Sequence, residues 1–328
     1  MLESCFRRIG PVVTLELYSG KNVTSLNYRV ETKAGQFALK RRPVASAATT
    51  FSCEVAQQRY FASCGMPTPE ILLTEAGEPI VRFGAYAWVL SRYVSGYYFT
   101  GETTELESAA SALARFTAAA AGTSQDDLGF WVHEKTDFLH ELPDLVSRAS
   151  KELGDSVLRI LSDLELVKKF ARSTPKLVPM HLDYHPLNIL VSGGSVIAVI
   201  DFEHFKVVPV PVGAGFACYK LVRQHIVHVG GRSPSAAQRD SWLVRWLAAW
   251  NSGAPEQLRL DDPVQLGMGA KYRVLFLIHK ILAEMLRAGE NRFAYDLGKQ
   301  LRSLSEIAML FPDQDGKYLK GSADDALS

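Results

Sequence analysis

The chain has 328 residues, of which 47% are hydrophobic and 22% charged, and its formal net charge is +1. These values are ordinary for a globular protein, and the length allows two domains or one bilobal unit. The near-zero charge argues against a general nucleic-acid or membrane-surface role. No apolar run could span a bilayer, and the opening residues MLESCFRRIG lack the apolar core of a signal peptide. We therefore expect a cytoplasmic protein without nucleic-acid or membrane partners.

The first third of the chain has the pattern of a small sheet with one helix. Residues 25–32 (SLNYRVET) and 36–42 (QFALKRR) alternate apolar and polar side chains around KAG, which predicts a hairpin. A helix is expected over residues 49–65, because its apolar residues recur at helical spacing and Gly65 would end it. Further strands are expected in PEILLTE (69–75), EPIVRF (78–83) and YAWVLSRYV (86–94).

From Thr103 onward the pattern is helical nearly throughout, and only residues 177–205 interrupt it. The fold class is therefore α+β, with a small β-rich N-terminal lobe at 1–93 and a larger, mainly helical C-terminal lobe at 94–312. Residues 313–328 are polar and are expected to form a flexible tail. A two-lobed protein of this kind would have a cleft near the linker SRYVSG, residues 91–96.

The four cysteines, Cys5, Cys53, Cys64 and Cys218, are scattered and form no C-x-x-C pair. We expect reduced and mostly buried thiols, as is usual for cytosolic proteins.

The stretch MHLDYHPLNILV concentrates polar side chains that could serve chemistry. His181, Asp183 and His185 alternate like metal ligands on a strand, but Pro186 breaks that strand and no cluster elsewhere completes a zinc site. A buried loop without chemistry would explain His181 and an asparagine that bond the backbone. It would not explain a second carboxylate, Asp201, after the following apolar run, because buried carboxylates call for a cation.

A phosphoryl-transfer site accounts for more of these residues. In the pattern H-x-D-x-x-x-x-N, Asp183 would receive or orient a hydroxyl proton and Asn188 would face a Mg²⁺ ion. Asp201 would bind the Mg²⁺ that bridges the nucleotide phosphates, and the segment ILVSGGSVIAVI would form a hairpin between these two ligands. Upstream, Lys40 on a strand and Glu54 on the next helix supply the cation for the phosphates and the carboxylate that holds it. The agreement of these parts favours a kinase-like site.

In these motifs and their order the chain resembles the aminoglycoside phosphotransferase and choline kinase family of small-molecule kinases. The matching stretches, which lie between Ser19 and Glu203, are SGKNVTSLNYRVET, FALKR, EVAQQRYFASCGMPTPEIL, WVLSRYVSG, HLDYHPLNIL and VIDFE. The resemblance implies a protein-kinase-like fold, ATP between the lobes, Mg²⁺ as cofactor and phosphoryl transfer to a hydroxyl of a small molecule.

The resemblance also assigns roles to particular residues. It implies a backbone hinge for adenine near Leu90, Arg92 and Tyr93, and a phosphate-covering turn near Asn22. Asp183 would be the catalytic base, with Asn188 and Asp201 as magnesium ligands and Lys40 with Glu54 at the phosphates. Glu203 would lie beside the metal or take part in substrate binding.

The acceptor pocket is expected among the helices after Phe205. Residues 205–300 hold 13 Lys/Arg and 7 Asp/Glu. A polycationic aminoglycoside would need an acidic pocket, so we expect an amino acid such as homoserine, a sugar or an amino alcohol. Lys220 and Arg223, in a helix expected to begin after a flexible PVPVGAG, are the candidates for binding a polar or anionic group. The alternatives are ordinary surface charge, an aminoglycoside-type antibiotic kinase, an inactive kinase-like binding protein, and a metallohydrolase. The sequence gives no indication of an oligomeric state.

Overall fold

The computed structural model describes residues 2–19, 25–44, 50–123, 130–173, 176–230, 234–288, 293–313 and 315–318. Its chain contacts define two compact units. Unit 1 comprises Met1–Tyr98, Gln125–Trp131 and Leu187–Phe205, and unit 2 comprises Phe99–Ser124, Val132–Pro186 and Lys206–Ser328. The division of the chain at residues 93 and 312 stays a prediction.

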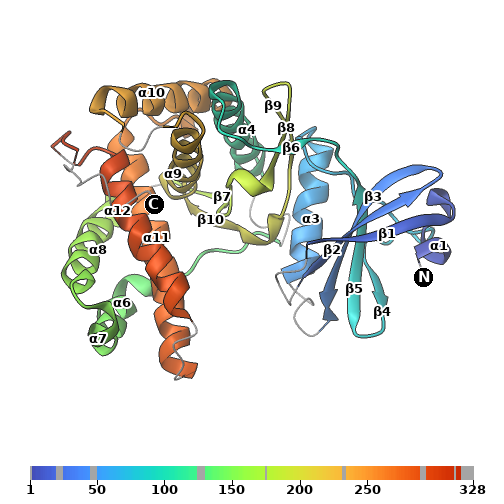
Figure 1. Cartoon of the computed structure of the whole chain (residues 1–328), viewed down its shortest axis with the longest axis horizontal. Coiled ribbons are helices and arrows are strands. Elements are labelled where there is room, and N and C mark those ends of the chain that lie inside the picture. Colours follow the sequence, from blue (N-terminus) through green and yellow to red (C-terminus); the bar gives the residue numbers. More distant parts are fainter. Residues whose placement is uncertain are drawn as a thin grey trace. The chain divides into compact units, whose positions relative to one another are not determined.

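Unit 1 contains an antiparallel sheet of strand order β1-β2-β3-β5-β4 (Figure 1). Its strands are β1 (Val12–Ser19), β2 (Leu26–Thr32), β3 (Gly35–Pro43), β4 (Val81–Phe83) and β5 (Tyr86–Arg92). The hairpin predicted around KAG is formed by β2 and β3. The predicted helix is α3 (Thr50–Ser63), and Gly65 follows it with φ +70°.

Two expectations for this sheet are wrong. β1 was not predicted, and residues 69–75 form no strand, because only an isolated bridge joins Ile71 to Ser91. β1 is an edge strand whose Val13, Leu15 and Leu17 are exposed. Val13, Leu15 and Leu17 alternate with Thr14 and Glu16, so the strand pattern was present in the sequence and was overlooked.

Both faces of strands β3 and β5 are covered, and this decides where the charged side chains of β3 lie. On one face, Phe51 and Val55 of α3 pack against Ala87 and Val89 of β5. The other face packs against the N-terminal segment of α1 (Leu2–Cys5) and η1 (Arg7–Ile9). Opposite residues of paired strands share a face, and Lys40 and Arg42 lie opposite Val89 and Ala87. Both cations therefore lie on the α3 side of the sheet.

A second, three-stranded sheet of unit 1 has the order β6-β8-β9. It consists of β6 (Tyr97–Tyr98), β8 (Ile189–Ser192) and β9 (Ser195–Val199), and η3 (Phe202–His204) follows. The predicted hairpin is β8–β9, with Gly193 and Gly194 at φ +56° and +75° in its turn. Phe61 of α3 packs against Phe202, with ring centroids 5.7 Å apart, and this contact holds the segment after β9 against α3.

Unit 2 is mainly helical. Its helices are α4 (Thr103–Ala121), α6 (Phe138–Arg148), α7 (Ser150–Leu153), α8 (Ser156–Ser173), α9 (Val210–His228), α10 (Ala236–Gly253), α11 (Pro263–Ala288) and α12 (Ala294–Leu310). The long helix α11 packs against α9, α12, α8 and α6, and α4 packs against α10 (Figure 1). A two-stranded sheet pairs β7 (Leu177–His181) with β10 (Phe205–Pro209), and β7 leads directly into the H-x-D motif.

The segment PVPVGAG is not a flexible lead into a helix, as the sequence suggested. α9 begins at Val210, and every residue from there to Tyr219 is buried. A Cβ on Gly215 would lie 2.0 Å from the Leu266 carbonyl oxygen of α11, and one on Gly269 would lie 1.8 Å from the Pro211 oxygen. The glycines are therefore needed for close packing of α9 against α11, and not for mobility.

None of the helices in the described ranges combines the length and apolar character needed to cross a membrane. The four cysteines form no disulfide. Only Cys218 is buried and Cys64 is exposed, so the expectation of mostly buried thiols is wrong.

Candidate active site

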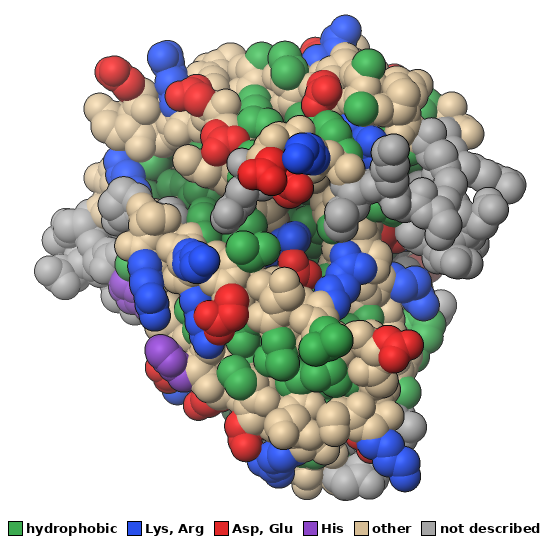
Figure 2. Space-filling view, turned by 90° about the vertical axis from the view of Figure 1, so that its left-hand side faces the viewer, with side chains coloured by type: hydrophobic (Ala, Val, Ile, Leu, Met, Phe, Trp, Pro, Cys, Tyr) green, Lys and Arg blue, Asp and Glu red, His purple; other side chains and the backbone are tan. Residues whose placement is uncertain are grey.

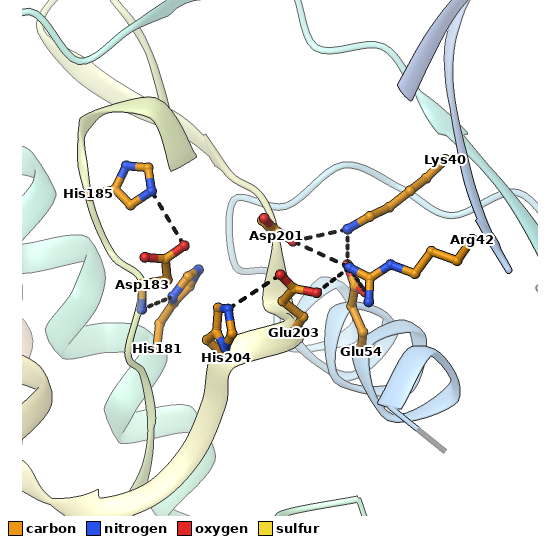
Figure 3. Close-up of polar contacts among 9 residues, drawn as sticks. All are labelled: Lys40, Arg42, Glu54, His181, Asp183, His185, Asp201, Glu203 and His204. Carbon is orange, nitrogen blue, oxygen red and sulfur yellow. Dashed lines mark hydrogen bonds and ion pairs between the residues drawn. The ribbon is translucent and has the colours of Figure 1, made fainter. Parts of the chain in front are cut away.

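Five charged side chains of unit 1 form what we call the charged cluster: Lys40, Arg42, Glu54, Asp201 and Glu203 (Figure 3). Lys40 Nζ lies 2.5 Å from Glu54 Oε1 and 3.0 Å from Asp201 Oδ1. Glu54 projects from α3, and Asp201 directly precedes η3. The structure therefore brings together three residues that the sequence motifs selected from distant segments.

Arg42 belongs to the charged cluster but was missed by sequence reasoning. Its Nη2 lies 2.5 Å from Glu203 Oε2 and 3.2 Å from Glu54 Oε2, and its guanidinium lies over the Phe51 ring, 5.3 Å from the centroid. The residue is only 8% exposed. A signal existed, because residues two apart on a strand share a face and Arg42 follows Lys40 at that spacing.

The electrostatics of the cluster favour the charged forms of Lys40 and Glu203. Burial on its own would lower the pKa of Lys40, but the carboxylates of Glu54 and Asp201 outweigh it and raise that pKa above the usual 10.5. The hydrogen bond with His204, together with the charge of Arg42, outweighs burial and lowers the pKa of Glu203 to about 2. Three carboxylates and two cations leave the cluster with a formal charge of −1.

The oxygen donors of the cluster fit a divalent cation. Glu54, Asp201 and Glu203 each offer a carboxylate oxygen, and these oxygens all lie within 4.8 Å of one another. Asn188, the other predicted ligand, lies at the end of η2 (Pro186–Asn188) and is 6% exposed. Its backbone carbonyl accepts a hydrogen bond from the Ile200 N–H at 3.0 Å. Carboxylate and amide oxygens are the hard ligands that Mg²⁺ prefers.

Asp201 has an unusual backbone. Its φ is +65°, and no other non-glycine residue in the described ranges has a positive φ. Such a conformation costs on the order of 1–3 kcal/mol and persists only where surrounding structure imposes it. The next residue, Phe202, is fully buried. Packing thus holds the Asp201 carboxylate toward Lys40 in a conformation that a relaxed strand end would not adopt.

The predicted adenine hinge is already hydrogen-bonded within the β-rich unit. The Leu90 oxygen accepts from Leu72 N at 2.8 Å, Arg92 N donates to Glu70 O at 2.8 Å, and Tyr93 N donates to Gln36 O at 3.1 Å. The Arg92 side chain also pairs with Glu70. Adenine binding at this segment would therefore need a backbone N–H other than those of Arg92 and Tyr93, whereas the Leu90 oxygen can still accept a second hydrogen bond. Asn22 lies outside the described residues.

In unit 2, the loop after β7 presents Asp183. The Asp183 N–H donates to His181 Nδ1 at 3.2 Å, and His185 Nε2 lies 3.4 Å from Asp183 Oδ2 (Figure 3). Tyr184 points the other way: its hydroxyl donates to the Ala109 oxygen of α4 at 2.9 Å, and the ring is buried. Asp183 itself keeps 33% of its side chain exposed. The loop is therefore anchored on both sides of an accessible carboxylate.

The match to known families decides the identity. The family model of the phosphotransferase enzyme family matches residues 18–260. The chain belongs to this family. The enzymes of this family are kinases of small molecules that carry a hydroxyl acceptor, and they use ATP with Mg²⁺. No curated protein matches the sequence.

Solved structures share the fold of this phosphotransferase. Amicoumacin kinase hAmiN, in complex with AMP-PNP, Ca²⁺ and Ami, is 12% identical with a TM-score of 0.68, covering 95% of this chain and 93% of that chain. Spectinomycin phosphotransferase APH(9)-Ia, in complex with ADP and spectinomycin, is 10% identical with a TM-score of 0.63, covering 93% and 92%. A thermostable mutant of aminoglycoside phosphotransferase APH(4)-Ia is 18% identical with a TM-score of 0.56, covering 92% and 96%. The fold is thus α+β and protein-kinase-like.

The two predicted acceptor-binding residues of this phosphotransferase differ in their surroundings. Arg223 Nε lies 2.9 Å from Glu306 of α12, a buried carboxylate that also accepts a hydrogen bond from the Tyr219 hydroxyl. Lys220, one residue after Tyr219, is half-buried and lies over two aromatic rings. The Arg223 guanidinium is therefore engaged within the protein.

Proposed function

We propose that this phosphotransferase moves the γ-phosphoryl group of Mg·ATP to a hydroxyl of a small molecule such as an amino acid (homoserine), a sugar or an amino alcohol. The observation that supports this most strongly is Lys40, whose ammonium lies between Glu54 at 2.5 Å and Asp201 at 3.0 Å. A lysine held by a helix carboxylate next to a metal-binding aspartate is the arrangement that phosphoryl transfer from Mg·ATP requires.

Five residues of unit 1 have roles in this proposal. Lys40 binds the nucleotide phosphates and Glu54 orients it. Asn188 and Asp201 hold Mg²⁺, and Glu203 is close enough to Asp201 to offer a further oxygen. When bound, Mg²⁺ neutralises charge on the phosphates and fixes their orientation. A cluster with a formal charge of −1 has the sign needed to receive that cation.

Asp183 acts on the acceptor. The acceptor oxygen forms a bond to the γ-phosphorus, the bond from that phosphorus to the bridging oxygen of ADP breaks, and the hydroxyl proton passes to Asp183. The N–H contact to His181 and the side-chain contact to His185 hold the carboxylate in place. A base in hydrogen-bond reach of its proton contributes about 10²–10⁴ in rate.

A coupled assay of ADP release from Mg·ATP tests the proposal. The panel contains amino alcohols, sugars, hydroxy-amino acids and aminoglycosides, and the product is confirmed by mass as a phosphate ester. We expect turnover with at least one compound that is not an aminoglycoside.

Two other results would contradict the proposal. Turnover with aminoglycosides alone would favour an antibiotic kinase. Tight Mg·ATP binding without turnover across the whole panel would favour a kinase-like binding protein, although the complete set of Lys40, Glu54, Asp183, Asn188 and Asp201 argues against loss of activity.

A further inference from the structure

The basic excess of residues 205–300 is mostly neutralised by carboxylates that lie elsewhere in the chain. The pairs are Lys271–Asp163 at 2.6 Å, Arg273–Glu134 at 2.7 Å, Arg223–Glu306 at 2.9 Å and Arg245–Glu107 at 3.0 Å. In agreement, Lys and Arg side chains lie interspersed with Asp and Glu on the face shown in Figure 2, and they form no uniform basic patch there. The net count therefore does not describe a basic pocket, and each cation has to be judged by its own surroundings.

Lys220 is not one of these paired cations. Its Nζ lies 5.1 Å from the Phe216 ring centroid and 4.8 Å from that of Tyr219. It makes no hydrogen bond or ion pair with any residue in the described part of the chain. Aromatic rings attract an ammonium but do not replace a counter-ion for a charge that is half-buried. Among the described residues, Lys220 is therefore a cation without a paired carboxylate.

The charged groups that act on Lys220 include the proposed catalytic base. Burial, and then the cations Lys299 of α12 and Arg223 of α9, lower its pKa to about 8, while Glu306 and Asp183 act in the opposite direction. Glu306 is already engaged by Arg223 and Tyr219. Asp183 is the proposed base, and it belongs to the same compact unit as Lys220. An anion on Lys220 would thus lie within electrostatic reach of the carboxylate that receives the acceptor proton.

We propose that Lys220 binds an anionic group of the acceptor, and that the acceptor is therefore a small hydroxyl compound carrying a carboxylate or a phosphate. This inference rests on the proposed function, because it assumes that Asp183 faces the acceptor hydroxyl. The sequence predicted both Lys220 and Arg223 as acceptor-binding residues, and the inference selects Lys220 as the specificity-determining one. The two rings under the ammonium give the site an apolar floor next to the charge.

The protonation of Lys220 gives the site a pH dependence. Below pH 8 the ammonium is charged and binds the anion, and above that pH it is increasingly neutral. Binding of the anion favours the charged form and raises the pKa of Lys220. The KM for an anionic acceptor should therefore rise with pH above 8, by about tenfold per unit at its steepest, while the KM for a neutral acceptor stays level.

Kinetics with matched acceptors test the proposal. The pairs are L-homoserine with L-homoserine amide, and glycerate with glycerol, so that each pair differs only in the anionic group. Lys220→Met keeps the length and apolar stem of the side chain but removes its charge. It should lower kcat/KM for the anionic member about 10–150-fold, the loss expected for a charge-assisted hydrogen bond, and leave the neutral member within about threefold. The control is Lys280→Met, which removes an exposed lysine that also lies over a phenylalanine ring, 5.9 Å away.

A labelling measurement decides the question independently of turnover. Acetylation of Lys220 by acetic anhydride at pH 8 is followed by mass spectrometry, without additions and with inorganic phosphate, L-homoserine, glycerate or Mg·ATP. The proposal predicts protection of Lys220, but not of Lys280, by at least one of the phosphate, homoserine and glycerate probes. Protection by Mg·ATP alone would mean that the nucleotide supplies the anion, and no protection by any probe would mean that no anion binds; either result overturns the proposal. Protection without turnover of any hydroxyl compound would leave the anion site standing and refute the proposed reaction.

Discussion

Asp183 lies between two histidines that contact it differently. His181 accepts a hydrogen bond from its backbone N–H, and His185 lies 3.4 Å from its carboxylate. Replacement of Asp183 by Asn keeps the shape and the backbone contact but removes the base. We expect kcat to fall about 10²–10⁴-fold, with little change in the thermal stabilisation by Mg·ATP, because the nucleotide-binding residues are untouched. Turnover near the wild-type rate would remove Asp183 from the mechanism.

Lys40 and Glu54 should act as one unit. Lys40→Met and Glu54→Gln each break the 2.5 Å ion pair, so the double mutant should lose less than the sum of the single losses. We expect a coupling energy of about 0.5–3 kcal/mol in kcat/KM.

The exposed pair Arg245–Glu107, at 3.0 Å, is the matched control for this cycle. Its coupling energy, measured from the free energy of unfolding, should stay below about 1 kcal/mol. Strictly additive losses for Lys40 and Glu54 would show that their contact does not serve catalysis.

For single residues, the sequence predicted which side chains belong to the site better than it predicted what each side chain contacts. Lys40, Glu54 and Asp201 were selected by motif, and the structure brings their side chains together. Arg42 was missed because a second cation on a strand is usually solvated, and its burial depends on Phe51 and Glu203 from other segments. Arg223 was predicted to bind the acceptor, but it pairs with Glu306 of another helix. No local sequence pattern predicts that contact.

Helix packing in unit 2 depends on glycines that face a neighbouring backbone. Alanine at Gly215 or Gly269 would place a Cβ 2.0 or 1.8 Å from a carbonyl oxygen, so α9 and α11 would have to move apart. We expect each substitution to lower the free energy of unfolding by about 1–3 kcal/mol or more, measured by urea denaturation.

Gly298 of α12 provides the control, because a Cβ there meets no atom within 4 Å. Gly298→Ala should raise the free energy of unfolding by about 0.4–1 kcal/mol, since alanine favours the helix and restricts the unfolded chain. Equal effects at Gly215 and Gly298 would contradict the packing argument.

Elements were predictable where one face is buried and the boundary residues are typical. The β2–β3 hairpin, α3 and the β8–β9 hairpin meet that condition. β1 does not meet it, because Val13, Leu15 and Leu17 are exposed, but these residues alternate with Thr14 and Glu16 and the strand could have been predicted. The start of α9 was misjudged because prolines and glycines usually mark loops, whereas here a proline lies in the first turn, Gly213 packs against Met180 and Gly215 faces α11.

For the whole molecule, Mg·ATP should act as a stabilising ligand. A ligand that binds only the folded protein adds about 2.7 kcal/mol at a hundred times its Kd. Asp201→Asn should abolish the Mg²⁺-dependent part of this gain, because an amide is a weaker ligand and carries no charge to neutralise. Asn tolerates a positive φ, so the variant should fold.

Thermal-shift titrations with ATP, with and without Mg²⁺, measure the effect. The matched control is Asp144→Asn, an exposed carboxylate of α6 that pairs with Arg148. A full Mg²⁺-dependent shift in Asp201→Asn would place the metal away from this residue.

Charge balance is also a property of the whole molecule. The net charge is +1, although residues 205–300 hold 13 basic and 7 acidic residues. The compensating acids lie in α4, in α8, near residue 134 and in α12, and the fold brings each to its cation. A count of charged residues within one segment leaves out the partners that lie in other segments.

The left-handed backbone at Asp201 also limits how this enzyme could evolve. A branched or bulky side chain is strained at a φ of +65°, so most replacements would disturb the fold before they affected phosphoryl transfer. Asparagine and glycine suit this conformation, and both are a single base change away from an aspartate codon. A lineage released from selection for catalysis, but still selected for a folded product, would therefore drift at this position mainly to asparagine or glycine. Either residue here in a relative would mark a protein kept for something other than catalysis.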